Sequence, residues 1–288
     1  MDIVSGSAQQ TFDRLFGPEF GHGKAFDLAL LRAALAALGD PHKKLPPVIH
    51  VAGTNGKGST IAFMRAIAEV AGLRVHAFTK PHLFHLGERF AGAGAPASEE
   101  ALAAAAERIA AAAPDLSQFD AQIAAAFLLF SETHADLALI ETGVGGRCDS
   151  TNAIDRPALS VITPIAADHE DILGPSLADI AAHKAGILKR GVTAIVARQR
   201  EEARAIVEAE AERVGAPLLR QGVEWDAHMS AGHLVVQTDT RVLDLPAPSL
   251  HGAHQVDNAG LACVALMRWR DLGDDACAAG VASANLPA

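Results

Sequence analysis

The sequence contains no tyrosine, and aromatic residues make up only 5% of its 288 positions, so platforms for stacking nucleic-acid bases are scarce. Positive charge is also in deficit, since the formal net charge is −10, which argues against a broad nucleic-acid-binding surface. No hydrophobic run approaches the roughly 20 residues of a transmembrane helix. The N-terminus lacks the basic start and apolar run of a signal peptide. We therefore expect neither nucleic acid nor membrane as a partner.

Cysteine is nearly absent as well. The three cysteines, Cys148, Cys263 and Cys277, are odd in number and lack the spacing of a metal site. This usage fits a reducing compartment, and we expect a cytoplasmic protein. What the sequence has in abundance is hydrophobic residues, at 50% of positions, which is ample for a large core.

The segment from Leu45 to Ala71 carries the clearest chemical signal. A short apolar run at 48–51 precedes a glycine-rich turn and then good helix formers, which is the order strand, turn, helix. Main-chain N–H groups of such a turn can surround a phosphate together with the positive end of the helix. The alternative is a tight glycine turn without a ligand. The predicted phosphate-binding residues are Gly53, Thr54, Asn55, Gly56, Lys57, Gly58 and Ser59.

Two side chains of this loop have distinct expected roles. Lys57 can place a point charge on the outer phosphates of a nucleotide, and the Ser59 hydroxyl can reach a magnesium ion. Without a ligand, Lys57 is expected to be a surface charge whose replacement by alanine leaves stability nearly unchanged. The spacing is not the generic Walker A pattern, because only Thr54 and Asn55 separate the first two glycines.

Strands and helices alternate along most of the chain, which predicts an α/β fold with a mostly parallel sheet flanked by helices. Residues 1–24 are expected to be an irregular arm, and residues 25–288 the nucleotide-binding domain. Strands are predicted at 48–51, 73–78, 135–140, 158–163 and 193–197, with a short apolar run at Leu218. A small antiparallel sheet is predicted within 224–245, and helices at 26–38, 98–113, 119–133, 176–187, 200–214, 254–270 and 274–284.

Polar clusters follow several predicted strands, and a parallel sheet brings such loops to one edge. Glu141 ends an apolar strand, where its carboxylate can meet phosphate-bound magnesium, although an acid at a strand end can also be purely structural. His169 can ligate a metal with Asp168 orienting it, or the pair can cap a loop. The glycine run 143–147 ends in an arginine that can bind an anion, or it is an ordinary turn. Lys184, in an alanine-rich helix, reads as a solvated lysine.

Seven motifs in order carry a family resemblance. They are HVAGTNGKGST at 50–60, PHL at 81–83, ERF at 88–90, IETGVGGRCDSTN at 140–152, ITPIAADHEDILG at 162–174, KAGI at 184–187 and HQVDNA at 254–259. Together they resemble the bifunctional dihydrofolate synthase/folylpolyglutamate synthase family of the Mur ligase superfamily. The resemblance implies a P-loop ligase domain that uses ATP and Mg²⁺ to join L-glutamate to dihydropteroate or a folate through an acyl phosphate. It also implies a monomer.

The resemblance assigns roles residue by residue. It makes Lys57, His169 and Lys184 catalytic, with Lys184 matching a lysine that carries a carbamate in the family. It implies magnesium ligands at Ser59, Glu141, His169 and Lys184, and a nucleotide contact at Asn258. The implied pterin and folate contacts are Phe26, Asp27, Leu28, Ala29, Phe119, Asp120, Gln122, Cys148, Asp149 and Ser150.

The chain also departs from the family pattern. Lys80 stands where the family has a metal-binding serine, Asp120 where it has a glutamate, and His183 where it has another glutamate. An ammonium group at position 80 would repel a dication and could itself neutralise phosphate charge. The family continues beyond the last residues seen here into a second α/β domain, and without it we expect an open site with little turnover.

Two other functions are weighed against the folate ligase. The chain can be a non-catalytic nucleotide- or pterin-binding descendant of the family. It can also be another Mur-type ligase, such as an enzyme of peptidoglycan synthesis, which the wording of the first and last motifs disfavours.

Overall fold

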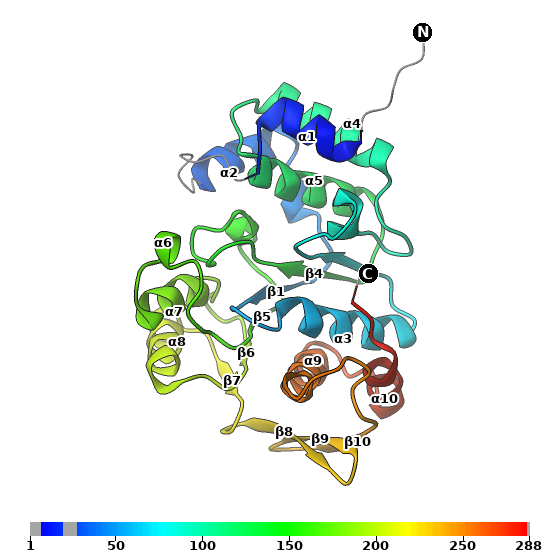
Figure 1. The fold of residues 1–288 in the computed structure, drawn as a ribbon, viewed down its shortest axis with the longest axis vertical. Coiled ribbons are helices and arrows are strands. Elements are labelled where there is room, and N and C mark those ends of the chain that lie inside the picture. Colours follow the sequence, from blue (N-terminus) through cyan, green and yellow to red (C-terminus); the bar gives the residue numbers. More distant parts are fainter. Residues whose placement is uncertain (1–6, 20–27, 287–288) are drawn as a thin grey trace.

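The predicted strands pair into one large sheet in a computed structural model, which describes residues 7–19 and 28–286. The strand order is β3-β2-β4-β1-β5-β6-β7, and only the short edge pair β2–β3 is antiparallel (Figure 1). The sheet is therefore mostly parallel, as predicted. Its strands are β1 Val48–Ala52, β2 Val75–Phe78, β3 Phe90–Ala91, β4 Leu137–Glu141, β5 Leu159–Ile162, β6 Ala194–Val196 and β7 Leu218–Arg220.

Helices cover both faces of this sheet (Figure 1), because the strand side chains that point to either face are apolar. Ile49 and Val51 of β1 join the core under α3, α9 and α10, whereas Val48 joins the core under α2, α4 and α5. Helices α7 and α8 pack on each other beside β5 and β6. The bounds are α2 Leu28–Ala37, α3 Lys57–Val70, α4 Glu99–Ala112, α5 Gln118–Glu132, α6 Glu170–Leu173, α7 Leu177–Ala185, α8 Glu201–Val214, α9 His254–Trp269 and α10 Asp274–Ser283, with short 3-10 turns at Pro41–Lys43, Leu86–Arg89 and Ser150–Ala153.

The predicted irregular arm over residues 1–24 is wrong where the structure describes it. Ala8–Phe16 forms helix α1, which begins with a capping box in which Ser7 and Gln10 bond each other's main chain. Phe12 is fully buried, and its ring centroid lies 5.9 Å from that of Phe16. The helix forms because it can bury this apolar stripe against α4 and α5.

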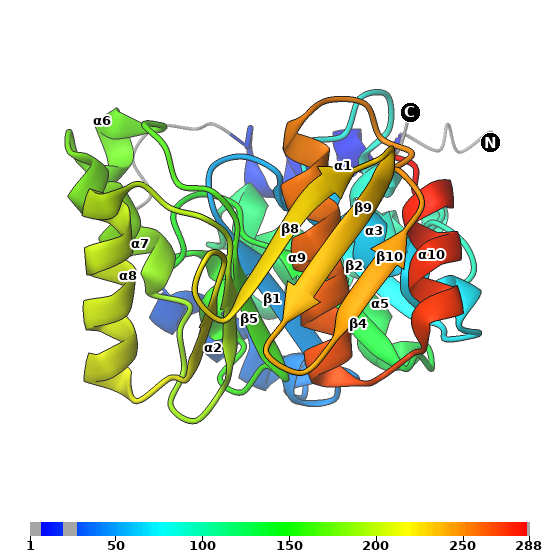
Figure 2. The ribbon, with the colours of Figure 1, turned by 90° about the horizontal axis from the view of Figure 1, so that it is seen from below.

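The predicted antiparallel sheet is present as β8 Trp225–Ser230, β9 His233–Thr238 and β10 Val242–Leu245. Figure 2, seen from below, shows these strands in front of α9, with α10 beside β10, and their buried residues join the core that contains α3, α9 and α10. A cavity of about 210 Å³ lies between this sheet and α9, and its lining includes Trp225, Arg241 and Met267. None of residues 53–59, the predicted phosphate loop, lines this cavity.

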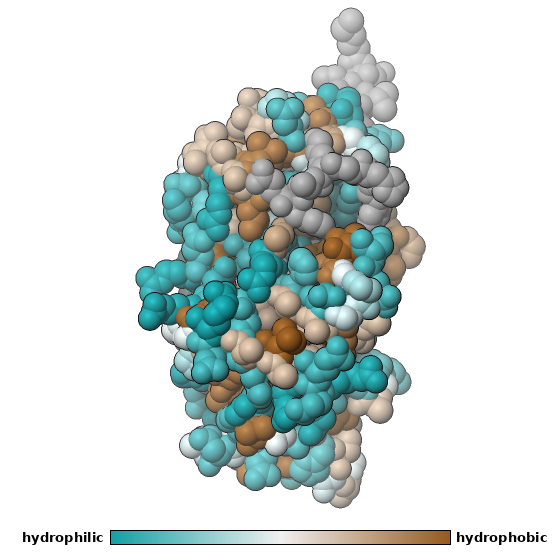
Figure 3. All heavy atoms as spheres, turned by 90° about the vertical axis from the view of Figure 1, so that its left-hand side faces the viewer, coloured by the Kyte–Doolittle hydropathy of each residue, from teal (hydrophilic) through white to brown (hydrophobic). Residues whose placement is uncertain are grey.

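One exposed face is shown in Figure 3, on the side of α6, α7 and α8. Its described surface is mostly hydrophilic, and hydrophobic residues form small separate groups. In residues 7–19 and 28–286, no helix combines the length and apolar character needed to cross a bilayer.

Candidate active site

The phosphate loop joins β1 to α3 at the carboxyl edge of the sheet. The Thr54 and Asn55 main-chain N–H groups donate to the Pro164 carbonyl at 3.0 and 3.2 Å. The Thr54 hydroxyl donates to the Ala166 carbonyl at 3.0 Å. These bonds fasten the loop to the segment after β5. The first-turn amides of α3, which by helix geometry have no intrahelical acceptor, are left to bind an anion.

Two glycines of the loop have no room for a side chain. A Cβ on Gly53, at φ +145°, would lie 1.9 Å from the Thr163 hydroxyl oxygen. A Cβ on Gly56, at φ +84°, would lie 2.3 Å from the Asn258 side-chain oxygen. Both glycines are therefore required by close packing and by backbone conformation.

Two lysines converge on one carbonyl oxygen of this loop. Lys57 Nζ donates to the carbonyls of Gly53 at 3.0 Å and Thr54 at 3.1 Å. Lys184 Nζ, from α7, donates to the same Gly53 oxygen at 2.9 Å. The expectation that Lys57 is a surface charge is wrong, since its side chain is only 14% exposed. The loop folds around the ammonium group because its own carbonyls supply the acceptors.

Lys184 is buried rather than solvated, which overturns its reading from sequence alone. Burial and the nearby charge of Lys57 lower the pKa of Lys184 to about 8. About a tenth of the lysine population is then a neutral amine at pH 7 and about half at pH 8, and a neutral amine is a nucleophile.

Glu141 lies at the end of β4, beside the first turn of α3. Its Oε1 is 3.8 Å from Lys57 Nζ, and its Oε2 accepts the main-chain N–H of Lys80 at 3.3 Å. Burial raises the pKa of Glu141 to about 7, although Lys57 opposes the rise. A buried carboxyl group with this pKa can ionise when a dication arrives.

Helix α9 packs against the same loop. Asn258 is 3% exposed, and its amide donates to Gln255 Oε1 at 2.9 Å. Gln255 in turn donates to the Ser59 hydroxyl at 3.3 Å. Gln255 was not singled out from sequence. The signal available for it was its place in the HQVDNA motif.

The chemistry of the donor set fits Mg²⁺ held partly by phosphate. Among the described residues, no three His, Cys, Asp or Glu side chains form a metal cage. Ser59 and Glu141 flank the same helical turn, and Mg²⁺ is commonly bound by one or two protein groups plus phosphate oxygens. The His169 side chain is 44% exposed, and its Nε2 is 3.7 Å from Asp168 Oδ1.

Eight of the ten residues assigned to the pterin or folate lie in the described part of the chain. Asp120 accepts hydrogen bonds from the hydroxyls of Ser117 and Ser150, both at 2.5 Å. Leu28 is half-buried and Ala29 exposed in α2, and Cys148 is half-buried. Phe26 and Asp27 lie outside the described residues.

Two further residues assigned to the pterin or folate already form hydrogen bonds within the protein. Asp149 is fully buried, and its carboxylate accepts from Val144 N at 2.8 Å, from Thr151 N at 3.0 Å and from the Thr151 hydroxyl at 2.5 Å. Gln122 is also fully buried, and its Oε1 accepts from Arg89 at 2.7 Å. Both therefore support the surrounding loops in this state.

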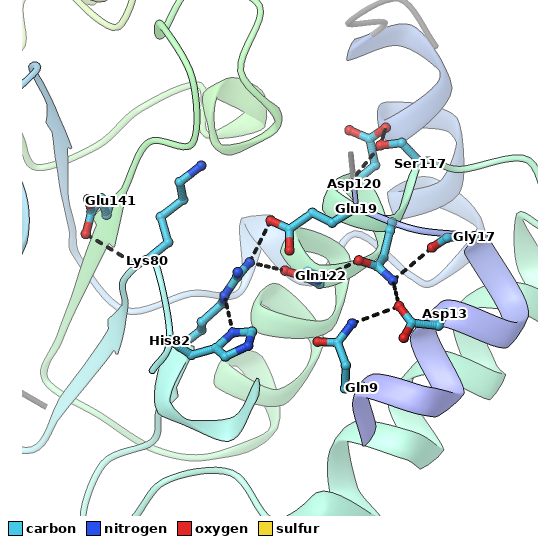
Figure 4. Close-up of polar contacts among 12 residues, drawn as sticks. Gln9, Asp13, Gly17, Glu19, Lys80, His82, Ser117, Asp120, Gln122 and Glu141 are labelled. Carbon is cyan, nitrogen blue, oxygen red and sulfur yellow. Dashed lines mark hydrogen bonds and ion pairs between the residues drawn. The ribbon is translucent and has the colours of Figure 1, made fainter. Parts of the chain in front are cut away.

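Arg89, from the ERF motif, is the centre of a buried network that the sequence did not reveal. Its guanidinium donates to Glu19 Oε1 at 2.8 Å, to Gln122 and to His82 Nδ1 at 2.9 Å (Figure 4). Because arginine can only donate, His82 must hold its Nδ1 unprotonated. The network joins the segment after α1 to α5 and to the loop after β2.

The glycine run 143–147 serves packing rather than an exposed anion site. A Cβ on Gly143 would lie 2.4 Å from the Phe119 ring, and one on Gly146 would lie 2.8 Å from the His183 carbonyl. Arg147 donates to Glu210 Oε1 at 2.9 Å and is therefore paired with α8.

Comparisons with known proteins agree with this geometry. Residues 51–266 match the Mur ligase middle domain. The dihydrofolate synthase/folylpolyglutamate synthase of Bacillus subtilis is 36% identical over 280 residues, which are 90% of this chain and 64% of that protein. The solved structure of Escherichia coli FolC in complex with DHPP and ADP superposes with a TM-score of 0.88 at 33% identity, covering 100% of this chain and 68% of that one.

The chain belongs to the dihydrofolate synthase/folylpolyglutamate synthase family.

A further structure of this synthase family was solved with Mn, AMPPNP and L-glutamate bound, and has a TM-score of 0.86 at 32% identity, covering 98% of this chain and 67% of that one. The chain spans less than two thirds of the length of the Bacillus subtilis synthase. The family resemblance drawn from the seven motifs is confirmed.

The position of Glu141 in this synthase-family site gives a prediction on pH. A carboxyl whose pKa is raised on folding keeps its proton longer in the folded state, so the stability it contributes is present below about pH 4.5 and is lost as pH rises to about 7. Glu141→Gln removes this loss. Relative to wild type, we expect the ligand-free variant to gain up to about 3 kcal/mol on going from pH 4.5 to pH 8.

Urea unfolding of both proteins across this pH range measures the difference. Glu69→Gln, at a 41% exposed carboxylate on α3, is the matched control and should leave the pH profile unchanged. A difference between wild type and Glu141→Gln that does not vary with pH would contradict the raised pKa.

Proposed function

We propose that this chain is the nucleotide-binding part of an ATP-dependent ligase that joins L-glutamate to dihydropteroate or a folate. The observation that carries the proposal is the convergence of Lys57 and Lys184 on the phosphate loop, with Glu141 beside its helix. The synthases that resemble the chain support the substrate class.

The proposed reaction has two displacements. A carboxylate oxygen of the pterin substrate attacks the γ-phosphorus of ATP, and the bond to the β-phosphate oxygen breaks with its electron pair leaving on ADP. The neutral amine of glutamate then attacks the acyl carbon, phosphate leaves, and the amine proton passes to solvent. Charge moves onto phosphoryl oxygens in the first step, so fixed cations and N–H donors are the main requirement.

The residues of the loop would act by exchange of partners. Lys57 would leave the carbonyls of Gly53 and Thr54 for the outer phosphates, while the first-turn amides of α3 bind phosphate oxygens and Asn258 contacts the nucleotide. Ser59 and Glu141 would hold Mg²⁺, which when bound neutralises phosphate charge.

Lys184 is proposed to carry a carbamate, with His169 as a further metal ligand. The ammonium group would first lose a proton, and the neutral amine would then attack the carbon of CO₂, forming an N–C bond and releasing a second proton, so that a cation becomes an anion. The pKa of about 8 makes the neutral amine available. The charge of Asp168 acts on Lys184, and His169 follows Asp168 in the same loop.

A labelling experiment tests the carbamate. After equilibration with ¹³C-bicarbonate at pH 8, wild type should show one protein-bound carbamate signal by ¹³C NMR, and Lys184→Met should lose it. Lys189→Met, which changes a half-buried lysine after the end of α7, should retain the signal. A wild-type spectrum without the signal, or one that Lys184→Met leaves intact, contradicts the assignment.

Calorimetry tests the proposed function itself. The purified chain should bind ATP with Mg²⁺, and should bind dihydropteroate in the presence of a non-hydrolysable ATP analogue. Absence of nucleotide binding overturns the proposal. We further propose that the protein acts in the cytoplasm, since Cys148, Cys263 and Cys277 are free thiols. We also propose that it is a monomer. Sedimentation at working concentration measures the oligomeric state.

A further inference from the structure

Lys80 connects the phosphate side of the site to the residues around Phe119. Its main-chain N–H donates to Glu141 Oε2 at 3.3 Å, which fixes the backbone beside the phosphate loop. Its side chain runs the other way, and Nζ lies 5.2 Å from the centroid of the Phe119 ring. Figure 4 shows the extended side chain of Lys80 reaching into the space between Glu141 on one side and Glu19 and Asp120 on the other.

The Lys80 ammonium group has no anion of its own. Within residues 7–19 and 28–286 it forms no ion pair with a carboxylate, although it is half-buried. Burial lowers the pKa of Lys80, and among the nearby charges those of Asp149 and Glu19 oppose this lowering most strongly. Those two carboxylates are already bonded, Asp149 by Val144 and Thr151 and Glu19 by Arg89. The site therefore holds an unneutralised cation against an aromatic face.

The position of Lys80 indicates which anion its ammonium group can bind. The phosphate loop already has Lys57, Lys184 and the first-turn amides of α3. Lys80 directs its charge to the opposite side of Glu141, toward Phe119. Under the proposed function, the second anion that must reach this place is the carboxylate that attacks the phosphate.

We infer that Lys80 is the cationic partner of the reacting carboxylate of the acceptor substrate, and so determines specificity for an anionic acceptor. The inference rests on the proposed function. The ammonium group offsets the repulsion between the carboxylate and the phosphates, two anions that must approach within bonding distance. An acceptor whose carboxylate is replaced by a carboxamide loses this charge-assisted hydrogen bond and should bind weakly.

The experiment compares two ligands on three variants by calorimetry, with the non-hydrolysable ATP analogue and Mg²⁺ present. The ligands are dihydropteroate and its carboxamide, and the variants are Lys80→Met, Lys80→Arg and the control Lys43→Met, which changes a surface lysine paired with Asp40. Lys80→Met should weaken dihydropteroate binding by roughly tenfold or more and leave carboxamide binding unchanged. Lys80→Arg should restore most of the preference, and Lys43→Met should match wild type.

Each other outcome is decisive. If Lys80→Met weakens both ligands equally, or Lys80→Arg behaves as Lys80→Met, the lysine has a structural role and the inference fails. If Lys80→Met leaves the affinity for dihydropteroate unchanged, the inference fails. If that variant also binds a second Mg²⁺ with the nucleotide, Lys80 takes the place of a metal ion instead. If wild type binds nucleotide but neither pterin ligand, the proposed function fails and the inference with it.

Discussion

Lys57→Met should lower the affinity for ATP by at least about 100-fold, because it removes the charge-assisted hydrogen bonds that the ammonium group would make to phosphate oxygens. The same ammonium group is 3.8 Å from Glu141 and holds the carbonyls of Gly53 and Thr54. Calorimetric titration with ATP and Mg²⁺ measures the loss. Arg65→Met, on the same helix but paired with Glu69 at its surface, is the control and should bind normally.

The variant should also lose stability, in a way that depends on pH. At pH 8 it leaves the ionised Glu141 carboxylate buried without its cation, which should cost on the order of 1 kcal/mol or more. At pH 6 the loss should shrink, because Glu141, with a pKa of about 7, then carries a proton. ATP binding by Lys57→Met within threefold of wild type would show that the phosphate site is wrongly placed.

Gly53→Ala should be the most destabilising single substitution in the loop. Its Cβ would meet the Thr163 hydroxyl at 1.9 Å and the Thr163 carbonyl oxygen at 2.9 Å, with φ at +145°. We expect the free energy of unfolding to fall by about 3 kcal/mol or more, as strain adds to overpacking. Urea denaturation followed by circular dichroism gives the value.

Gly72→Ala separates the two contributions. Gly72 has a φ of +82°, and a Cβ built there meets nothing within 4 Å, so only backbone strain should be felt. A loss of about 1 kcal/mol is expected. Equal losses for Gly53→Ala and Gly72→Ala would mean that the loop can move away from Thr163, and that the close contact is not a constraint.

Local pattern sufficed to place the glycine-rich turn and Glu141 in the fold. The turn, its glycines and the acid at a strand end are short-range features, and a parallel sheet places the ends of β1 and β4 side by side, with Val51 opposite Glu141. Helix α1 was also recoverable, because Ser7 and Gln10 form a capping box and the apolar residues at 8, 12 and 16 lie one helical turn apart. The glycines around this segment obscured that pattern.

Burial of single polar side chains could not be read in the same way. Lys184 lies in an alanine-rich helix that looks solvated until α7 is packed against the phosphate loop. Asp149 looks available to a ligand until Thr151 and Val144 are found to bond it. Arg89 looks like a surface charge until Glu19 and Gln122 surround it. Each of these facts depends on contacts between distant segments.

The bond from Gln255 to Ser59 spans 196 positions, and that from Lys184 to Gly53 spans 131. The ribosome therefore makes the loop at 53–59 well before it makes α9, and the proposed nucleotide site of the nascent chain is incomplete during the interval. Loop-closure entropy over such separations makes assembly of this site a late event in folding as well. Nucleotide bound to the assembled site would then stabilise the whole chain, since the residues proposed to contact it lie on segments from the end of β1 to α9.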